Sequence, residues 1–220
     1  MVSSELEQRA RQTLGSSHEA IYTAVEELLA ERGASGVIAD VGCGGGALWD
    51  RLRSRFERCI GIDAVLFDEL PLDVDFRAAD LDAGVLPVPD CAADVTVAVE
   101  TIEHLENPRA FMRELTRITR PGGTLVVTTP NQLSALSLLT LATKQQFSAF
   151  QENSYPAHRT ALLEVDLRRI ASECGLEDVE IRYTTHGRLP LTARHYPRGI
   201  ARRLPRLLSD NVLLGARRGP

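Results

Sequence analysis

Acidic side chains follow short apolar runs in the first half of the chain, and the first of them begins a turn suited to ligand binding. Asp40 ends the run that begins at Val37, and glycines follow at positions 42, 44, 45 and 46. A glycine turn after a strand lets backbone N–H groups approach a ligand closely. A carboxylate beside this turn would repel a pyrophosphate and attract an ammonium group. Asp40 therefore favours a cofactor that carries an amino acid over a dinucleotide.

Three further acids occupy equivalent places along the chain. Asp63 ends a short apolar run and lies 21 positions after Gly42. This is close to the offset at which α/β nucleotide folds place a carboxylate on ribose hydroxyls. Asp80 and Glu100 each follow a further apolar run. Because ligands of open parallel sheets bind beyond the carboxyl ends of the strands, these acids should line one crevice.

The segment after Glu100 adds groups for acid-base chemistry or metal binding. Glu103 and His104 follow Glu100 at i+3 and i+4 spacing, which places all three on one face if the segment is helical. Histidine titrates near neutral pH, so His104 and His158 are candidate bases for an acceptor hydroxyl. Glu103 is a third catalytic candidate, and His186 a more remote one. Alternatively, a set of two carboxylates and two histidines could bind Mg²⁺ or Mn²⁺, and the ion would lower the pKa of the acceptor hydroxyl. This set is Glu100, Glu103, His104 and His158.

The elements that must position these groups alternate in type from residue 36 to residue 130. The predicted strands are 37–40, 58–63, 74–79, 94–99 and 124–129. The predicted helices between them include 47–56 and 109–120, and 121–123 predicts a turn. Strands and helices that alternate through short connections predict a doubly wound α/β protein with a parallel sheet.

The flanking regions are predicted to cover this core. Residues 3–32 have apolar residues at helical spacing and predict one or two amphipathic helices, in which His18 and Tyr22 could touch cofactor or acceptor. The insertion 131–157 has an apolar helical face, for which we prefer a lid over the acceptor to a partner or membrane contact. The remaining predicted elements are a helix at 160–174 and strands at 176–185 and 210–216.

Five segments in order, VIADVGCGGG, GID, AADL, VAVETIEHLENP and RPGGTLVVTTPN, resemble the class I S-adenosylmethionine-dependent methyltransferases over about residues 30–130. ETIEHL and TTPN look most like the quinone-biosynthesis O-methyltransferases and their small-molecule relatives. The resemblance implies a Rossmann-like, mostly parallel seven-stranded sheet and S-adenosylmethionine as cofactor, with Asp80 at the adenine amino group and Leu81 against the ring. The implied cofactor-binding residues are Asp40, Gly42, Cys43, Gly44, Asp63, Asp80, Leu81 and Glu100.

We expect residues 1–220 to form a single methyltransferase domain. Its predicted parts are an N-terminal helical cover (1–35), the cofactor-binding core (36–130), a lid-like insertion (131–157), and the C-terminal part of the sheet with the acceptor region (158–220). The predicted reaction moves a methyl group to a hydroxyl of a small metabolite such as a sugar or a phenol.

Two other functions stay open. A metal-dependent RNA 3′-end 2′-O-methyltransferase is favoured only by the glutamate and histidine set, and the acidic N-terminal half and missing aromatic-basic platform weaken it. A non-catalytic or dinucleotide-binding module is suggested because Gly42, Gly44 and Ala47 satisfy G-x-G-x-x-A. Asp40 opposes the dinucleotide, and we expect no second substrate domain within residues 1–220.

Composition and charge indicate where in the cell the protein is located and what kinds of partner it binds. The chain has a net charge of −5, no apolar run of membrane-spanning length and no signal-peptide layout, so we expect a cytoplasmic protein without a transmembrane segment. The four cysteines lack CxxC spacing and fit reduced thiols. Residues 182–220 hold nine arginines against one acid, which would suit an anionic acceptor, a phosphate or a membrane face, or simply reflects arginine as the general surface cation. A small-molecule acceptor is expected, nucleic acid is not, and a homodimer stays open.

Overall fold

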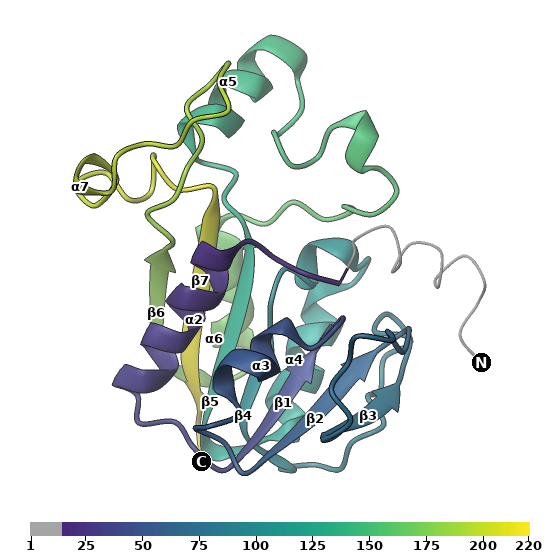
Figure 1. The fold of residues 1–220 in the computed structure, drawn as a ribbon. Coiled ribbons are helices and arrows are strands. Elements are labelled where there is room, and N and C mark those ends of the chain that lie inside the picture. Colours follow the sequence, from purple (N-terminus) through teal and green to yellow (C-terminus); the bar gives the residue numbers. More distant parts are fainter. Residues whose placement is uncertain (1–14) are drawn as a thin grey trace.

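The computed structural model describes residues 15–220, in which seven strands form a single sheet (Figure 1). The strands are β1 (Val37–Val41), β2 (Arg58–Asp63), β3 (Val74–Ala78), β4 (Ala93–Ala98), β5 (Thr119–Pro130), β6 (Leu176–Tyr183) and β7 (Asn211–Arg218). Their order is β3-β2-β1-β4-β5-β7-β6. The pairs from β3 to β5 are parallel, and β7 is antiparallel to both β5 and β6. The predicted doubly wound, mostly parallel seven-stranded sheet is confirmed.

Helices cover both faces of this sheet. The α-helices are α2 (Glu19–Glu31), α3 (Ala47–Leu52), α4 (Pro108–Ile118), α5 (Ala135–Lys144), α6 (Glu164–Glu173) and α7 (Arg198–Ala201), and the 3-10 helices are η1 (Ile102–His104) and η2 (Glu152–Ser154). Apolar residues of α2 and α3 form one core cluster, and those of α4 and α6 form the other, on the opposite face (Figure 1). Residues of β4 contribute to both clusters, with Val95 and Val97 on the α2 side and Ala98 on the α4 side. Ala93 also lies on the α4 side, because the register of the strand shifts between Ala93 and Val95. Burial on both faces explains why β4 is mostly apolar, and its buried Thr96 is satisfied by a hydrogen bond from the Thr119 hydroxyl at 2.7 Å.

Helix α2 packs closely against the sheet because of a glycine in β7. The apolar residues Ile21, Val25 and Leu28 recur at helical spacing and are buried. A Cβ at Gly215 would lie 2.5 Å from a methyl carbon of Leu28, so a larger residue there would force the Leu28 side chain to move. Helix α2 confirms the C-terminal part of the helical region predicted at 3–32, and residues 3–14 lie outside the described residues.

Several predicted boundaries were wrong, and the helix predicted at 47–56 ends at Leu52. The turn predicted at 121–123 is part of β5, where the pairing with β4 passes from Ala93↔Thr119 directly to Val95↔Thr124. The intervening residues bulge, and Gly122 adopts a φ of +73°. The helix predicted from residue 160 begins at Glu164. Thr160 is instead bound to the segment after β4, because its N–H donates to the Glu103 carbonyl at 3.0 Å.

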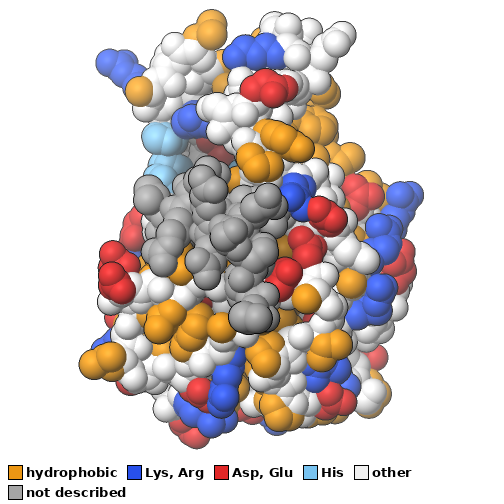
Figure 2. Space-filling view, turned by 90° about the vertical axis from the view of Figure 1, so that its right-hand side faces the viewer, with side chains coloured by type: hydrophobic (Ala, Val, Ile, Leu, Met, Phe, Trp, Pro, Cys, Tyr) orange, Lys and Arg blue, Asp and Glu red, His pale blue; other side chains and the backbone are white. Residues whose placement is uncertain are grey.

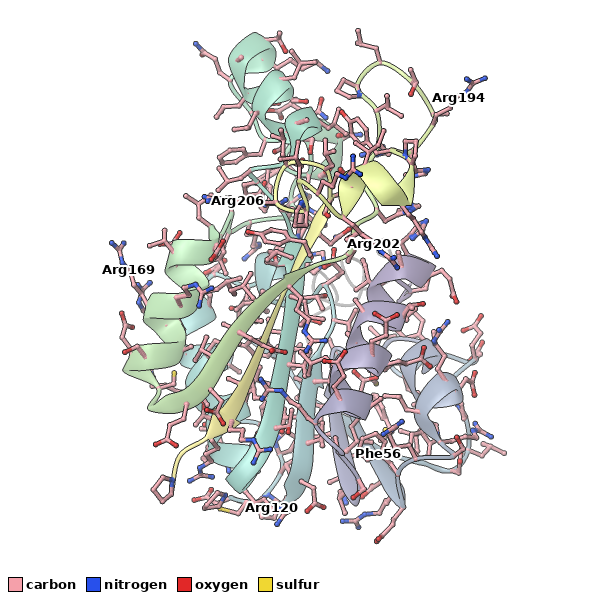
Figure 3. The ribbon with its side chains drawn as sticks, turned by 90° about the vertical axis from the view of Figure 1, so that its left-hand side faces the viewer. Phe56, Arg120, Arg169, Arg194, Arg202 and Arg206 are labelled. Atoms are coloured by element: carbon pink, nitrogen blue, oxygen red, sulfur yellow. The ribbon has the colours of Figure 1, made fainter. Side chains whose placement is uncertain are left out.

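The insertion and the C-terminal arginine-rich segment pack together beyond the carboxyl end of β5 (Figure 1). The side-chain amide of Asn131 donates to the carbonyls of Arg206 and Ser209 at 2.7 and 2.8 Å. Figure 3 shows Arg194, Arg202 and Arg206 at this end of the molecule and Arg120 at the opposite end. Within residues 15–220, none of the helices is long and apolar enough to cross a membrane.

Candidate active site

The turn after β1 has a backbone that favours glycine at positions 42, 44 and 46. Gly42, Gly44 and Gly46 adopt φ values of +83°, +50° and +80°. A Cβ at Gly42 would lie 2.2 Å from the Thr101 hydroxyl oxygen, and one at Gly44 would lie 2.1 Å from the Gly15 carbonyl. The Gly42 N–H donates to the Ile62 carbonyl at 2.7 Å, which joins the ends of β1 and β2. The glycines therefore let this turn pack closely against Thr101 and Gly15, and the N–H groups of Gly42, Gly44 and Gly46 all donate within the protein.

Asp63, at the end of β2, holds this turn in place. One of its carboxylate oxygens accepts the Gly44 N–H at 2.9 Å, and the other accepts the Ala64 N–H at 2.7 Å. Burial raises the pKa of this carboxyl group, while the backbone N–H donors act in the opposite direction. Asp63 thus has a structural role at the glycine turn in addition to the ribose contact expected from its position.

We expect Asp63→Ala to weaken S-adenosylhomocysteine binding severalfold, because the variant loses both the predicted ribose acceptor and the anchor of the Gly44 N–H. Isothermal titration calorimetry measures the affinity. Asp68→Ala is the matched control, since Asp68 is an exposed loop acid five residues along the chain. Equal affinities for Asp63→Ala and the wild-type protein would refute the role of Asp63.

Asp40 is a buried carboxyl group at the centre of the site. Burial raises its pKa to about 7, and the neighbouring Asp63 carboxylate contributes to the increase. With an uncharged ligand, Asp40 would be about half protonated at neutral pH. A cationic ligand beside it would favour the ionised form, because the two opposite charges attract in a poorly solvated site. Asp40 is therefore suited to a ligand with an ammonium or sulfonium group.

One cavity of about 770 Å³ contains most of the predicted site residues, a size typical of pockets that enclose whole small molecules. Residues 15–18 and Tyr22 line it on the side of α2. Asn153, Ser154 and Tyr155 line it from the insertion. The predicted site residues that it brings together are Asp40, Gly42, Cys43, Asp63, Asp80, Leu81, Glu100, Glu103, His104 and His158.

Glu103, His104 and His158 form a cluster in this cavity. One potential ligand atom from each lies within 4.8 Å of the other two, and the two imidazole rings meet edge to face with centroids 4.8 Å apart. Glu103 is fully buried, which raises the pKa of its carboxyl group well above the usual value, and the Glu100 charge adds to the increase. Neither carboxyl oxygen of Glu103 has a hydrogen-bond partner among the described residues. This arrangement is suited to receiving a proton or a cation.

The backbone of the insertion fixes the tautomer of His104. Its Nδ1 lies 2.9 Å from the Ala157 carbonyl, and because a carbonyl only accepts, Nδ1 must carry the proton. The lone pair of neutral His104 is then on Nε2. His158 is buried beside it, and burial followed by the proximity of His104 lowers the pKa of His158. His158 is thus favoured in its neutral form, as a proton acceptor or ligand.

Glu100 stands apart from this cluster, contrary to the four-residue set expected from the sequence. The segment forms a short 3-10 helix only from Ile102, and Glu100 adopts a left-handed φ of +49°. Its carboxylate accepts hydrogen bonds from the Thr128 hydroxyl at 2.9 Å and the Asn211 side-chain amide at 2.7 Å. Burial raises its pKa to about 7. Sequence reasoning missed both Asn211, which lines the cavity, and Thr128, which orients Glu100.

The chain matches the family described as "Methyltransferase domain" over residues 10–181. A "Probable S-adenosylmethionine-dependent methyltransferase" of Mycolicibacterium smegmatis is 30% identical over 204 residues, covering 88% of this chain and 71% of that protein. A "Ubiquinone biosynthesis O-methyltransferase" of Maricaulis maris is 29% identical over 106 residues, covering 44% of this chain and 41% of that protein. The chain therefore spans less than half the length of this second relative.

Solved structures share the fold at low sequence identity. The methyltransferase in a complex with the Haloferax volcanii Trm112 methyltransferase activator has a TM-score of 0.70 and 19% identity, covering 100% of this chain and 98% of that one. A SAM-dependent methyltransferase of Archaeoglobus fulgidus has a TM-score of 0.67 and 16% identity, covering 94% and 96%. Fold and site define a class I S-adenosylmethionine-dependent methyltransferase. The chain belongs to the methyltransferase domain family, as its sequence motifs predicted.

Proposed function

We propose that the protein transfers the methyl group of S-adenosylmethionine to a hydroxyl oxygen of a small molecule, with His104 as general base. The observation that carries this proposal is the continuous cavity that joins Asp40 and Asp63 to the histidine cluster. A relative named for O-methylation in ubiquinone biosynthesis supports an oxygen acceptor. Polar residues of the insertion, Asn153 and Ser154, line the same cavity and support a hydroxylated acceptor such as a sugar or a phenol.

The chemistry divides between cofactor and protein. The bound cofactor supplies a methyl group on a cationic sulfur, so its leaving group is already activated. The protein holds the acceptor oxygen in line with that methyl group, and His104 Nε2 accepts the hydroxyl proton. The Ala157 carbonyl keeps the other ring nitrogen protonated. Burial raises the pKa of the adjacent Glu103 carboxyl group well above its usual value, and the imidazolium that forms on His104 would in turn favour the ionised form of Glu103, since opposite charges attract.

A second form of this mechanism uses Mg²⁺ or Mn²⁺. It is favoured by the buried Glu103 carboxyl group, whose oxygens have no hydrogen-bond partner among the described residues. Glu103, His104 and His158 would hold the ion, which would lower the pKa of the acceptor hydroxyl. Glu100 would not coordinate the ion, since its oxygens accept hydrogen bonds from Thr128 and Asn211. It would contribute only the negative charge of its ionised form near the site.

The test is a calorimetric titration with S-adenosylhomocysteine, followed by methyl transfer to a panel of phenols, sugars and RNA 3′ ends before and after chelation. We expect binding without metal and turnover of a phenol or sugar that survives chelation, because His104 provides the base. Turnover lost on chelation and restored by Mg²⁺ or Mn²⁺ would favour the metal-assisted form. Absence of S-adenosylhomocysteine binding, or turnover only of RNA, would contradict the proposed function.

A further inference from the structure

Three histidines from two distant parts of the chain meet at the edge of the cavity, outside the Glu103 cluster. His18 is the N-cap of α2, whereas His186 and His195 lie between β6 and α7. The His186 ring stacks between the other two, with centroids 4.4 Å from His18 and 3.9 Å from His195. Figure 2 shows histidine side chains gathered in pale blue on the surface of this face.

The ring nitrogens of this group are available to a ligand. One nitrogen from each histidine lies within 4.8 Å of the other two. His18 Nδ1 accepts the Ala20 N–H at 3.2 Å, which leaves its Nε2 for another partner. His186 Nε2 is buried and has no hydrogen-bond partner among the described residues. A buried polar atom without a partner is costly, so a bound ion would remove an existing penalty.

The loop that carries two of these residues is well defined. His195 pairs with Arg188 in an isolated antiparallel bridge, and the Leu189 N–H donates to the Arg194 carbonyl at 2.8 Å. The His186 carbonyl accepts the Asp210 N–H at 3.0 Å, which ties the loop to the start of β7. The backbone therefore positions His186, while the exposed side chains of His18 and His195 can rotate.

The geometry needs only a modest adjustment for metal binding. Tetrahedral coordination with metal–nitrogen bonds of about 2.0–2.1 Å places ligand nitrogens roughly 3.3 Å apart. Rotation of the two exposed outer rings toward His186 would close the remaining separation. Nearby charges partly offset each other, since the Asp210 carboxylate and the Arg198 guanidinium both act on His186.

We propose that His18, His186 and His195 form a binding site for a divalent transition-metal ion of the zinc and nickel type. Three imidazoles without a carboxylate favour such ions over Mg²⁺ or Mn²⁺, which prefer oxygen ligands. His18 also lines the ligand cavity, so the ion joins the wall formed by residues 15–18 to the loop after β6. The fourth coordination position is open to water or to a ligand in the cavity.

The experiment is a calorimetric titration of the tag-free, metal-stripped protein with Zn²⁺, with and without excess Mg²⁺. We expect one Zn²⁺ ion at this site that Mg²⁺ does not displace, and a rise in melting temperature because the ion binds the folded chain. His195→Phe and His186→Phe keep an aromatic ring in the stack and remove one ligand each. Each should weaken Zn²⁺ binding at least tenfold and abolish the rise in melting temperature.

The control variant is His158→Phe, which removes a ligand of the other cluster. It should leave the Zn²⁺ affinity of this site unchanged. If His195→Phe and His186→Phe bind Zn²⁺ as the wild-type protein does, or if His158→Phe alone abolishes binding, the three-histidine site is refuted. Because His195 is exposed, its substitution tests the site without endangering the fold.

Discussion

His104→Ala should lower turnover by about 10²- to 10⁴-fold, the usual contribution of a positioned general base, while S-adenosylhomocysteine affinity changes by less than about twofold. The unequal effect follows from the shape of the cavity. His104 lies with His158 and the insertion, whereas Asp40 and Asp63 lie at the ends of β1 and β2. A group that acts only on the acceptor lowers the rate of transfer and leaves cofactor binding intact.

The measurement combines steady-state kinetics, with the acceptor identified in the panel, and calorimetry with S-adenosylhomocysteine. His104→Gln is an informative second variant, because glutamine keeps a polar side chain but cannot accept the proton. Arg169→Ala serves as the control, since Arg169 is exposed on α6, away from the cavity (Figure 3). Full activity of His104→Ala would remove His104 from the mechanism, and an equal loss of affinity would assign it to the cofactor.

The part of the site that the sequence predicted well is the part built from strand ends. Asp40, Asp63 and Asp80 each follow an apolar run, and the parallel order of β1, β2 and β3 brings their carboxyl ends together. A strand that is buried on both faces leaves little choice about where its first polar residue lies. The cavity therefore contains these residues as expected.

The sequence could not predict the separation of Glu100 from Glu103. A regular helix would have placed both on one face, but the left-handed backbone at Glu100 turns its carboxylate toward Thr128 and Asn211. Asn211 follows Glu100 by 111 positions and reaches it only because β7 pairs antiparallel with β5. No local pattern reports such a contact.

The group of His18, His186 and His195 is likewise formed by residues that are distant in the sequence. Its members share no periodicity, and two of them lie in a segment with no regular pattern. They meet because α2 begins, and the loop after β6 lies, at the same edge of the cavity. The sequence singled out His18 and His186 separately, but their meeting with His195 depends on long-range topology rather than on local propensity.

Asp40→Asn should stabilise the ligand-free protein at alkaline pH and weaken cofactor binding there. An acid whose pKa is raised on folding costs nothing below its unfolded pKa, and its cost grows as pH rises from the unfolded pKa to the folded pKa, here about 7, and is constant above it. Asparagine resembles the protonated form at every pH. The difference in unfolding free energy between variant and wild-type protein should therefore grow by roughly 2 to 3 kcal/mol between about pH 5 and pH 8, by linkage from the two pKa values.

Cofactor affinity should respond in the opposite sense. A ligand with an ammonium or sulfonium group favours ionised Asp40, so wild-type affinity should fall by up to about tenfold per pH unit as pH drops below 7. Asp40→Asn should bind the ligand more weakly than the wild-type protein at pH 8. Its affinity should also lack the pH dependence that comes from Asp40 ionisation. Urea unfolding at pH 5 and pH 8 measures the stability, and S-adenosylhomocysteine calorimetry at the same pH values measures the affinity. Asp75→Asn is the control, because Asp75 is an acid of β3 that does not line the cavity. A variant that gains stability without losing affinity would show that Asp40 is a buried acid with no part in binding. One that loses affinity without gaining stability would show that Asp40 is already ionised in the ligand-free protein.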